Sequence, residues 1–181
     1  MSHDSCRTTA YTATQKALHW SIFLLVIGLY GITYGEEFFP RGDPGRDTIW
    51  WLHISFGLLL AVLVLWRLAA RAINGAPPPT PGSGRLEHLL AAAGHGLLYL
   101  LLIAIPILGI ALTWLRGDEL SFFTLFTIPS PIAADRETAR AVKELHELSA
   151  NLILITAGLH AAAALWHHHF RRDGVLRRML P

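Results

Sequence analysis

Four long stretches of the chain carry no Lys, Arg, Asp or Glu, and this spacing of charges is the strongest pattern in the sequence. The charge-free stretches are residues 17–35, 48–66, 88–115 and 148–170. Each matches the roughly 18 to 20 residues that an α-helix needs to cross the hydrocarbon layer of a membrane. None alternates between polar and apolar residues as a half-buried β-strand does. The pattern predicts an all-α protein, an integral membrane four-helix bundle. The predicted spans are at about residues 17–35, 48–68, 89–114 and 145–168.

The segments between these stretches are polar and rich in turn-forming residues, so the whole chain, residues 1–181, is interpreted as one transmembrane domain. Residues 36–47 form a short first loop, and residues 74–84 form a second loop that is rich in proline. The third connection is longer, and Asp135 at its end is the predicted N-cap of the fourth helix. The single cysteine, Cys6, excludes an internal disulfide and any cysteine-ligated zinc or iron–sulfur centre.

Composition agrees with a membrane protein, and the positive charges give an orientation. Charged residues make up 15% of the 181, whereas soluble domains have about a quarter. The net charge of +2 does not indicate nucleic-acid binding, because the Lys and Arg residues are sorted by loop. The side with both termini and the second loop has nine: Arg7, Lys16, Arg67, Arg71, Arg85, Arg171, Arg172, Arg177 and Arg178. The other side has six: Arg41, Arg46, Arg116, Arg136, Arg140 and Lys143. Since Lys and Arg favour the cytoplasmic side, both termini are expected in the cytoplasm.

Histidines inside the predicted spans are the candidate functional residues, because ionisable side chains are costly in a membrane. His146 and His160 are fourteen residues apart in the fourth span. On a helix they lie about 21 Å apart and within roughly 40° of one face. His19 of the first span and His53 of the second differ in depth by roughly 17 to 20 Å. The spacing predicts two pairs, His19 with His160 near the cytoplasm and His53 with His146 near the outer side.

Two histidine pairs between apolar helices, with no carboxylate in the spans, favour six-coordinate haem iron. A zinc site would need three or four ligands at one level, and a non-haem iron site would need a carboxylate. A histidine taken alone could instead form a hydrogen bond between helices. Small residues near these levels would let a flat macrocycle approach the backbone: Gly28, Gly31, Gly57, Gly94, Gly96 and Gly158.

The sequence resembles the bacterial cytochrome b561 family along nearly its whole length. The motifs that carry the resemblance are His19-Trp20, Phe38-Phe39-Pro40-Arg41, Leu52-His53-Ile54-Ser55, Gly94-His95-Gly96-Leu97-Leu98-Tyr99, Leu145-His146-Glu147, Gly158-Leu159-His160 and Leu176-Arg177-Arg178-Met179-Leu180-Pro181. The similarity is strongest to the small members that oxidise superoxide and reduce ubiquinone. It implies a protein of the bacterial inner membrane with two b haems, and it implies ubiquinone as the electron acceptor.

The predicted function is transfer of single electrons across the membrane. A donor on the outer side would deliver an electron at His53 and His146, and the electron would leave beyond His19 and His160 to a quinone or another redox protein. If the donor is superoxide, basic residues of the third connection are the candidate catalytic residues that attract it. They are Arg116, Arg140 and Lys143, together with Arg136, and they are otherwise ordinary loop charges.

Two questions stay open from the sequence. His95 is expected to bind a cofactor, either as a quinone ligand or as a partner of a haem propionate; its other possible role is a structural hydrogen bond. Three function classes also remain: a superoxide:quinone oxidoreductase, an electron-transfer subunit of a dehydrogenase or hydrogenase, and a non-redox haem carrier or structural membrane protein. The loops are short and have no recognisable docking surface, which favours the first class over the second.

Overall fold

Four long helices make up nearly all of the protein. The computed structural model describes residues 10–78 and 84–180, so Cys6, Arg7 and the middle of the proline-rich loop lie outside the described residues. The helices are α1 (Ala13–Gly35), α2 (Pro44–Asn74), α3 (Arg85–Arg116) and α4 (Arg136–Trp166). The short elements are η1 (Glu36–Phe38), β1 (Leu120–Phe122), β2 (Phe126–Ile128), η2 (His167–Arg171) and η3 (Leu176–Arg178). Each predicted span falls within one of four helical segments that are long and apolar enough to cross a membrane. The predicted all-α membrane bundle is therefore confirmed.

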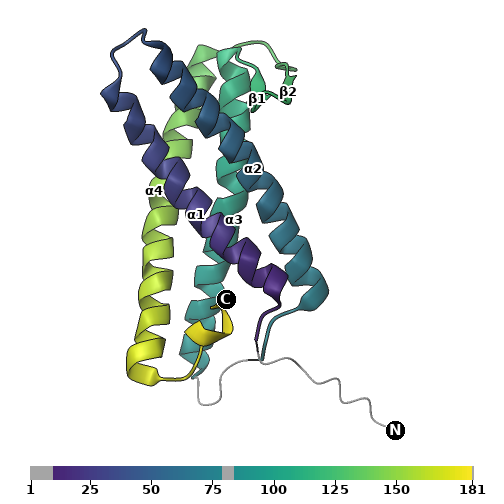
Figure 1. Cartoon of the computed structure of the whole chain (residues 1–181), viewed down its shortest axis with the longest axis vertical. Coiled ribbons are helices and arrows are strands. Elements are labelled where there is room, and N and C mark those ends of the chain that lie inside the picture. Colours follow the sequence, from purple (N-terminus) through teal and green to yellow (C-terminus); the bar gives the residue numbers. More distant parts are fainter. Residues whose placement is uncertain (1–9, 79–83, 181) are drawn as a thin grey trace.

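The helices are arranged as two antiparallel helix pairs (Figure 1). α1 packs along α2, α3 packs along α4, and the two helix pairs contact each other through α2 and α3. α1 and α4 scarcely approach each other at the level of the backbone within the described residues. The chain begins α1 and ends after η3 at one end of the bundle, here called the terminal end, and β1 and β2 lie at the opposite end, here called the hairpin end.

The buried core is a compact apolar cluster at the middle of the bundle. Its members, here called the apolar plug, are Ile22, Leu29, Leu60, Val64, Leu101, Leu102 and Ile153. Within each helix they recur at intervals of one, four or seven residues, which places them on the side that faces the other helices. Large apolar side chains elsewhere on the helices, such as Leu24 and Ile155, are exposed. An exposed apolar surface of this kind suits contact with lipid.

The third connection, predicted only as a loop, contains a β-hairpin that is fastened to α2. The Ser55 hydroxyl is fully buried; it donates a hydrogen bond to the Ser121 carbonyl oxygen at 3.1 Å and accepts one from the Phe123 backbone N–H at 2.9 Å. Trp51 Nε1 donates to the Ser121 hydroxyl at 3.1 Å. Phe123 has a positive φ of 49°, an uncommon conformation for a bulky residue. Ser55 therefore fixes the strained turn and holds the hairpin against the bundle.

The start of α4 agrees with the prediction made from the sequence. Asp135 is the N-cap, and its carboxylate accepts hydrogen bonds from the backbone N–H groups of Glu137 and Thr138 and from the Thr138 hydroxyl. These hydrogen bonds, that of the Thr138 hydroxyl first, hold the pKa of Asp135 below its ordinary value. A negative charge at this point also complements the positive end of the helix dipole.

The C-terminal tail folds back under the terminal end. Trp20 Nε1 donates to the Met179 carbonyl oxygen at 3.0 Å, and Arg178 donates to the Pro78 carbonyl oxygen at 2.6 Å. The Tyr11 backbone N–H donates to the Arg178 carbonyl oxygen at 3.4 Å. The tail thereby ties α1 to the second loop.

Replacing Ser55 with Ala should loosen the β-hairpin, because the Phe123 N–H would then be buried without an acceptor. The expected loss is about 1–3 kcal/mol in the free energy of unfolding. A lower midpoint of thermal unfolding in detergent, with faster proteolysis between residues 117 and 135, would show it. Thr48→Ala is the control, because Thr48 donates to the Pro44 carbonyl oxygen on an exposed turn; equal behaviour of the two variants would contradict the role given to Ser55.

Candidate functional site

Four of the histidines singled out from the sequence form two facing pairs. His19 of α1 faces His160 of α4, and their ring centroids are 6.3 Å apart. His53 of α2 faces His146 of α4, and their ring centroids are also 6.3 Å apart. The first pair, here called the terminal pair, lies toward the terminal end. The second, here called the hairpin pair, lies toward the hairpin end.

The separation within each pair matches that of two imidazoles on opposite sides of one metal ion. Two metal–nitrogen bonds of about 2.0 Å and two distances of about 1.1 Å from nitrogen to ring centre give roughly 6.2 Å between centroids, close to the 6.3 Å of each pair. A direct hydrogen bond between the rings would bring them closer, because its nitrogens are about 2.9 Å apart. No group of three or more His, Cys, Asp or Glu side chains that could hold a metal is found in residues 10–78 and 84–180. The donor set thus suits iron that takes its other four ligands from a macrocycle.

The helices are not closely packed at the glycines expected to flank such a macrocycle. α1 and α4 are joined by the terminal pair and have little close packing within the described part of the chain. A Cβ atom built on any glycine of the set expected to flank the macrocycle would meet no atom within 4 Å: Gly28, Gly31, Gly57, Gly94, Gly96 and Gly158. The residues present therefore fit an iron porphyrin between two imidazoles.

The hairpin pair is oriented by its surroundings. His146 Nδ1 lies 3.1 Å from the Ile105 carbonyl oxygen, so a proton on Nδ1 would be donated there and Nε2 would be left free as a ligand. Gly109 keeps α3 clear of this ring, since a Cβ atom there would lie 3.3 Å from His146 Cε1. His53 Nδ1 is buried and forms no hydrogen bond with any residue that the structure describes. A buried nitrogen without a partner is costly, and bonding to a metal can satisfy an imidazole nitrogen.

His95 lies beside the terminal pair and not within it. Its ring centroid is 5.2 Å from that of His160, and its Nδ1 is 2.6 Å from the Ala91 carbonyl oxygen of its own helix. The side chain is exposed. A third imidazole is thus available next to the terminal pair, on the α3 side of His160.

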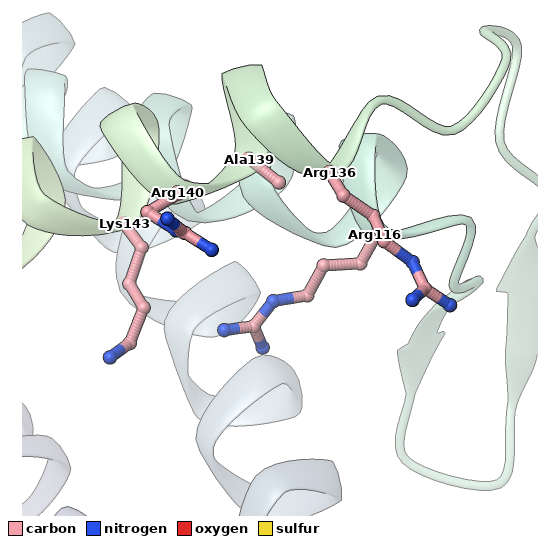
Figure 2. Close-up of a pocket in the computed structure, with 5 residues that line it drawn as sticks. All are labelled: Arg116, Arg136, Ala139, Arg140 and Lys143. Carbon is pink, nitrogen blue, oxygen red and sulfur yellow. The ribbon is translucent and has the colours of Figure 1, made fainter.

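The basic residues of the third connection gather around a pocket at the hairpin end (Figure 2). The pocket has a volume of about 390 Å³, and its lining residues are Arg116, Arg136, Ala139, Arg140 and Lys143. The Lys143 ammonium forms a salt bridge of 3.0 Å with Glu147. Arg116, Arg136 and Arg140 form no salt bridge with the residues that the structure describes. The sequence named these residues without placing them in a common pocket.

Helix geometry connects the pocket to the hairpin pair. Lys143 precedes His146 by three residues, so both side chains lie on one face of α4. Arg116 follows Gly109 by seven residues, which places it about 10 Å further along α3 and within roughly 20° of the same face. An anion in the pocket would therefore lie close to the hairpin pair.

Two residues near the histidines were missed as site residues from the sequence. Gly109 was missed because its importance depends on the position of His146, which belongs to another helix. Arg67 was counted only for orientation, although its guanidinium donates to the Gln15 carbonyl oxygen, one helical turn before His19, and lies 6.0 Å from the Tyr99 ring centroid. Its distance of fourteen residues from His53 repeats the distance between His146 and His160, and that repetition was a usable signal.

Comparison with known proteins places the chain in a family. The family model described as prokaryotic cytochrome b561 matches residues 10–181. The match covers all four helices and both histidine pairs. It confirms the resemblance given by the histidine motifs.

Curated relatives match over nearly their full length. The chain is 36% identical to the probable superoxide oxidase CybB of Yersinia pestis, over 94% of this chain and 96% of that protein. It is 30% identical to cytochrome b561 homolog 1 of Escherichia coli, over 94% of this chain and 97% of that protein. It is 33% identical to cytochrome b562 of Cereibacter sphaeroides, over 94% of each.

Replacing Gly109 with Val should displace the His146 ring, because the added side chain would overlap the space that this ring occupies. We expect the haem content of the purified protein to fall by about one equivalent, as measured by the pyridine haemochrome method. Ala111→Val is the control, because it places a valine on the same helix roughly 200° around the axis from Gly109. This variant should keep the full haem content. Equal haem content in the two variants would show that His146 does not depend on the clearance at Gly109.

Proposed function

We propose, since the chain belongs to the prokaryotic cytochrome b561 family of membrane electron-transfer proteins, that it binds two b haems and oxidises superoxide with ubiquinone as acceptor. The observation that carries the proposal is the equal separation of 6.3 Å in two histidine pairs at two depths of one bundle. His53 and His146 would hold one haem, and His19 and His160 the other. When bound, the haems would supply one-electron carriers at these two depths.

The chain's own residues would position and insulate these carriers. Each imidazole pair would hold one iron atom, and the hydrogen bond of His146 to the Ile105 carbonyl oxygen sets the orientation of that ring. The apolar plug separates the pairs; Ile153 lies seven residues from both His146 and His160. Burial among apolar side chains excludes water and shapes the reduction potentials.

Superoxide is the donor that the hairpin end suits best. The pocket lined by Arg116, Arg136, Arg140 and Lys143 concentrates positive charge near the hairpin pair, and a basic pocket raises the local concentration of a small anion. A relative at 36% identity is named a probable superoxide oxidase, which supports this choice. Loss of one electron converts superoxide to dioxygen.

Ubiquinone is the proposed acceptor at the terminal end. Reduction to the quinol takes up two electrons and two protons, so two superoxide ions are consumed for each quinone. His95 is exposed and lies next to His160, where its imidazole would contact a quinone bound at this level. The excess of Lys and Arg on the terminal side supports a cytoplasmic location of this end in a bacterial inner membrane.

A second candidate function is that of an electron-transfer subunit for a separate redox protein. The observation that favours it is the exposed apolar surface of the β-hairpin, where Leu125, Phe126 and Ile128 are 74%, 51% and 42% exposed. An exposed apolar patch can mark a protein-interaction site. Stopped-flow mixing of the purified, oxidised chain with superoxide separates the two functions. Rapid reduction of the haem Soret and α bands is expected for the first function and not for the second.

Single replacements of the four histidines test the ligand assignment. Wild-type protein should contain about two equivalents of non-covalent haem. His53→Ala and His146→Ala should both remove the same spectral component, and His19→Ala and His160→Ala the other, because ligands about 21 Å apart cannot share one iron. Pyridine haemochrome assays and potentiometric titration of the α band measure this. His88→Ala, at an exposed residue, is the control; complete loss of a haem in His95→Ala would show that α3 provides a ligand and refute the pairing.

Neutralising Arg116, Arg140 and Lys143 together to Gln should slow haem reduction by superoxide about tenfold at low ionic strength. The dependence on salt should flatten as well, because screening acts over about 10 Å at 0.1 M salt. Stopped-flow rates at several salt concentrations measure both effects. The triple replacement of Arg85, Arg172 and Arg177 by Gln removes the same charge from the terminal end and should leave the rate unchanged. Equal rates in the two triple variants would mean that the basic pocket does not guide superoxide.

A further inference from the structure

Arg67 occupies on α2 the place that a second histidine occupies on α4. Both helices run from the hairpin end to the terminal end. Each has a ligand candidate in its first half, His53 in α2 and His146 in α4. Fourteen residues later, α4 has His160 and α2 has Arg67. The two side chains therefore reach the same depth, each within roughly 40° of the face of its own hairpin-pair histidine. Arg67 thus faces the interior beside the terminal pair.

The contacts of Arg67 agree with this position. Its guanidinium donates a hydrogen bond to the Gln15 carbonyl oxygen at 3.1 Å, the oxygen that also accepts the helical hydrogen bond of His19. The guanidinium carbon lies 6.0 Å from the ring centroid of Tyr99 on α3. α1, α2 and α3 therefore meet at Arg67 next to the terminal pair.

A charge at this depth needs an anion, and the protein does not provide one within its described residues. Arg67 forms no salt bridge with residues 10–78 or 84–180. The side chain is half-buried, and a cation in this environment is costly unless it is paired. One hydrogen bond to a carbonyl oxygen leaves further guanidinium N–H groups, whose fork geometry suits a carboxylate. A b haem has two carboxylates, which makes it an anion of the right chemistry at the right depth.

We propose that Arg67, placed by Gln15 and Tyr99, binds a carboxylate of the haem at the terminal pair and raises the reduction potential of that haem. The proposal rests on the proposed binding of two haems. Uptake of an electron makes the haem more negative by one charge, and a fixed positive charge in a region of low dielectric constant stabilises that state. Arg67 is therefore a positioning residue that favours electron arrival at the terminal end.

Arg71 provides a matched control. It lies one helical turn further toward the terminal end on the same helix, and its guanidinium carbon is 5.8 Å from the ring centroid of Tyr11. Arg71 also donates to the Tyr11 hydroxyl at 3.4 Å. Arg67 and Arg71 thus have the same charge and a similar aromatic neighbour. Only Arg67 is adjacent to the turn of α1 that contains His19.

The experiment compares full-length wild type, Arg67→Gln, Arg67→Lys and Arg71→Gln. Potentiometric titration of the α bands gives the potential of each haem, and the pyridine haemochrome assay gives the haem content. Arg67→Gln should make the haem of the terminal pair about tenfold harder to reduce, or about 59 mV for one electron. The haem of the hairpin pair should not change. Arg71→Gln should change the equilibrium constant for reduction of the terminal haem less than about twofold. Arg67→Lys should restore most of the wild-type potential, because the charge is kept.

Several outcomes would overturn the proposal. They are an unchanged terminal potential in Arg67→Gln at full haem content, an equal shift in Arg67→Gln and Arg71→Gln, and a raised KM for quinone as the sole effect. If Arg67→Gln loses the terminal haem, Arg67→Lys decides between the two explanations. Recovery of the haem and of its potential in Arg67→Lys supports the proposal. Loss of the haem in both variants, with equal thermal destabilisation, assigns Arg67 a structural role at Gln15. A wild type without the terminal haem would overturn the proposed function as well, while two haems with no effect of Arg67 would overturn this proposal alone.

Discussion

An imidazole within the hydrocarbon layer is stable only when its nitrogens have partners, and in this bundle two facing pairs of such rings have to be satisfied at two depths. α4 sets the spacing, because His146 and His160 lie fourteen residues apart, about 21 Å, on one side of the helix. α2 provides the partner for one ring and α1 the partner for the other. α1 and α4 therefore meet through a histidine pair instead of through close backbone packing within the described chain.

The sequence predicted most of the fold because a membrane restricts the possible structures so strongly. Charge-free stretches that are long enough for a helical crossing and show no polar–apolar alternation favour helices, which satisfy their own backbone hydrogen bonds in a membrane. All four predicted spans fall within long apolar helices. Asp135 could be assigned as an N-cap because its hydrogen bonds are local. The β-hairpin could not be predicted in this way. Its strands are three residues long, and they are held by Ser55 and Trp51, which are more than sixty residues away in the sequence.

The candidate site was accessible from the sequence only where spacing along one helix carried the information. The depths of His146 and His160 follow from helical rise alone, and the structure brings a further histidine of the sequence opposite each of them. The environment of Arg67 and the clearance at Gly109 depend on contacts between different helices. The pocket around Arg116 and Arg140 likewise depends on how the end of α3 meets the start of α4. Residues of this kind need the packed bundle to be identified.

The apolar plug has an electrical consequence. Its seven side chains offer no hydrogen-bond donor or acceptor, so the plug itself contributes no group to a proton relay between the two pairs, while electrons need none. If the terminal end is cytoplasmic and quinone is reduced there, as proposed above, every electron that passes inward would carry negative charge across the core of the membrane. The protons of quinol formation would then be drawn from the cytoplasmic side. Turnover would then be electrogenic. It would work against a membrane potential that is negative inside, at up to about 2.3 kcal/mol per electron for each 100 mV, so an energised membrane would slow the protein and a depolarised one would release it.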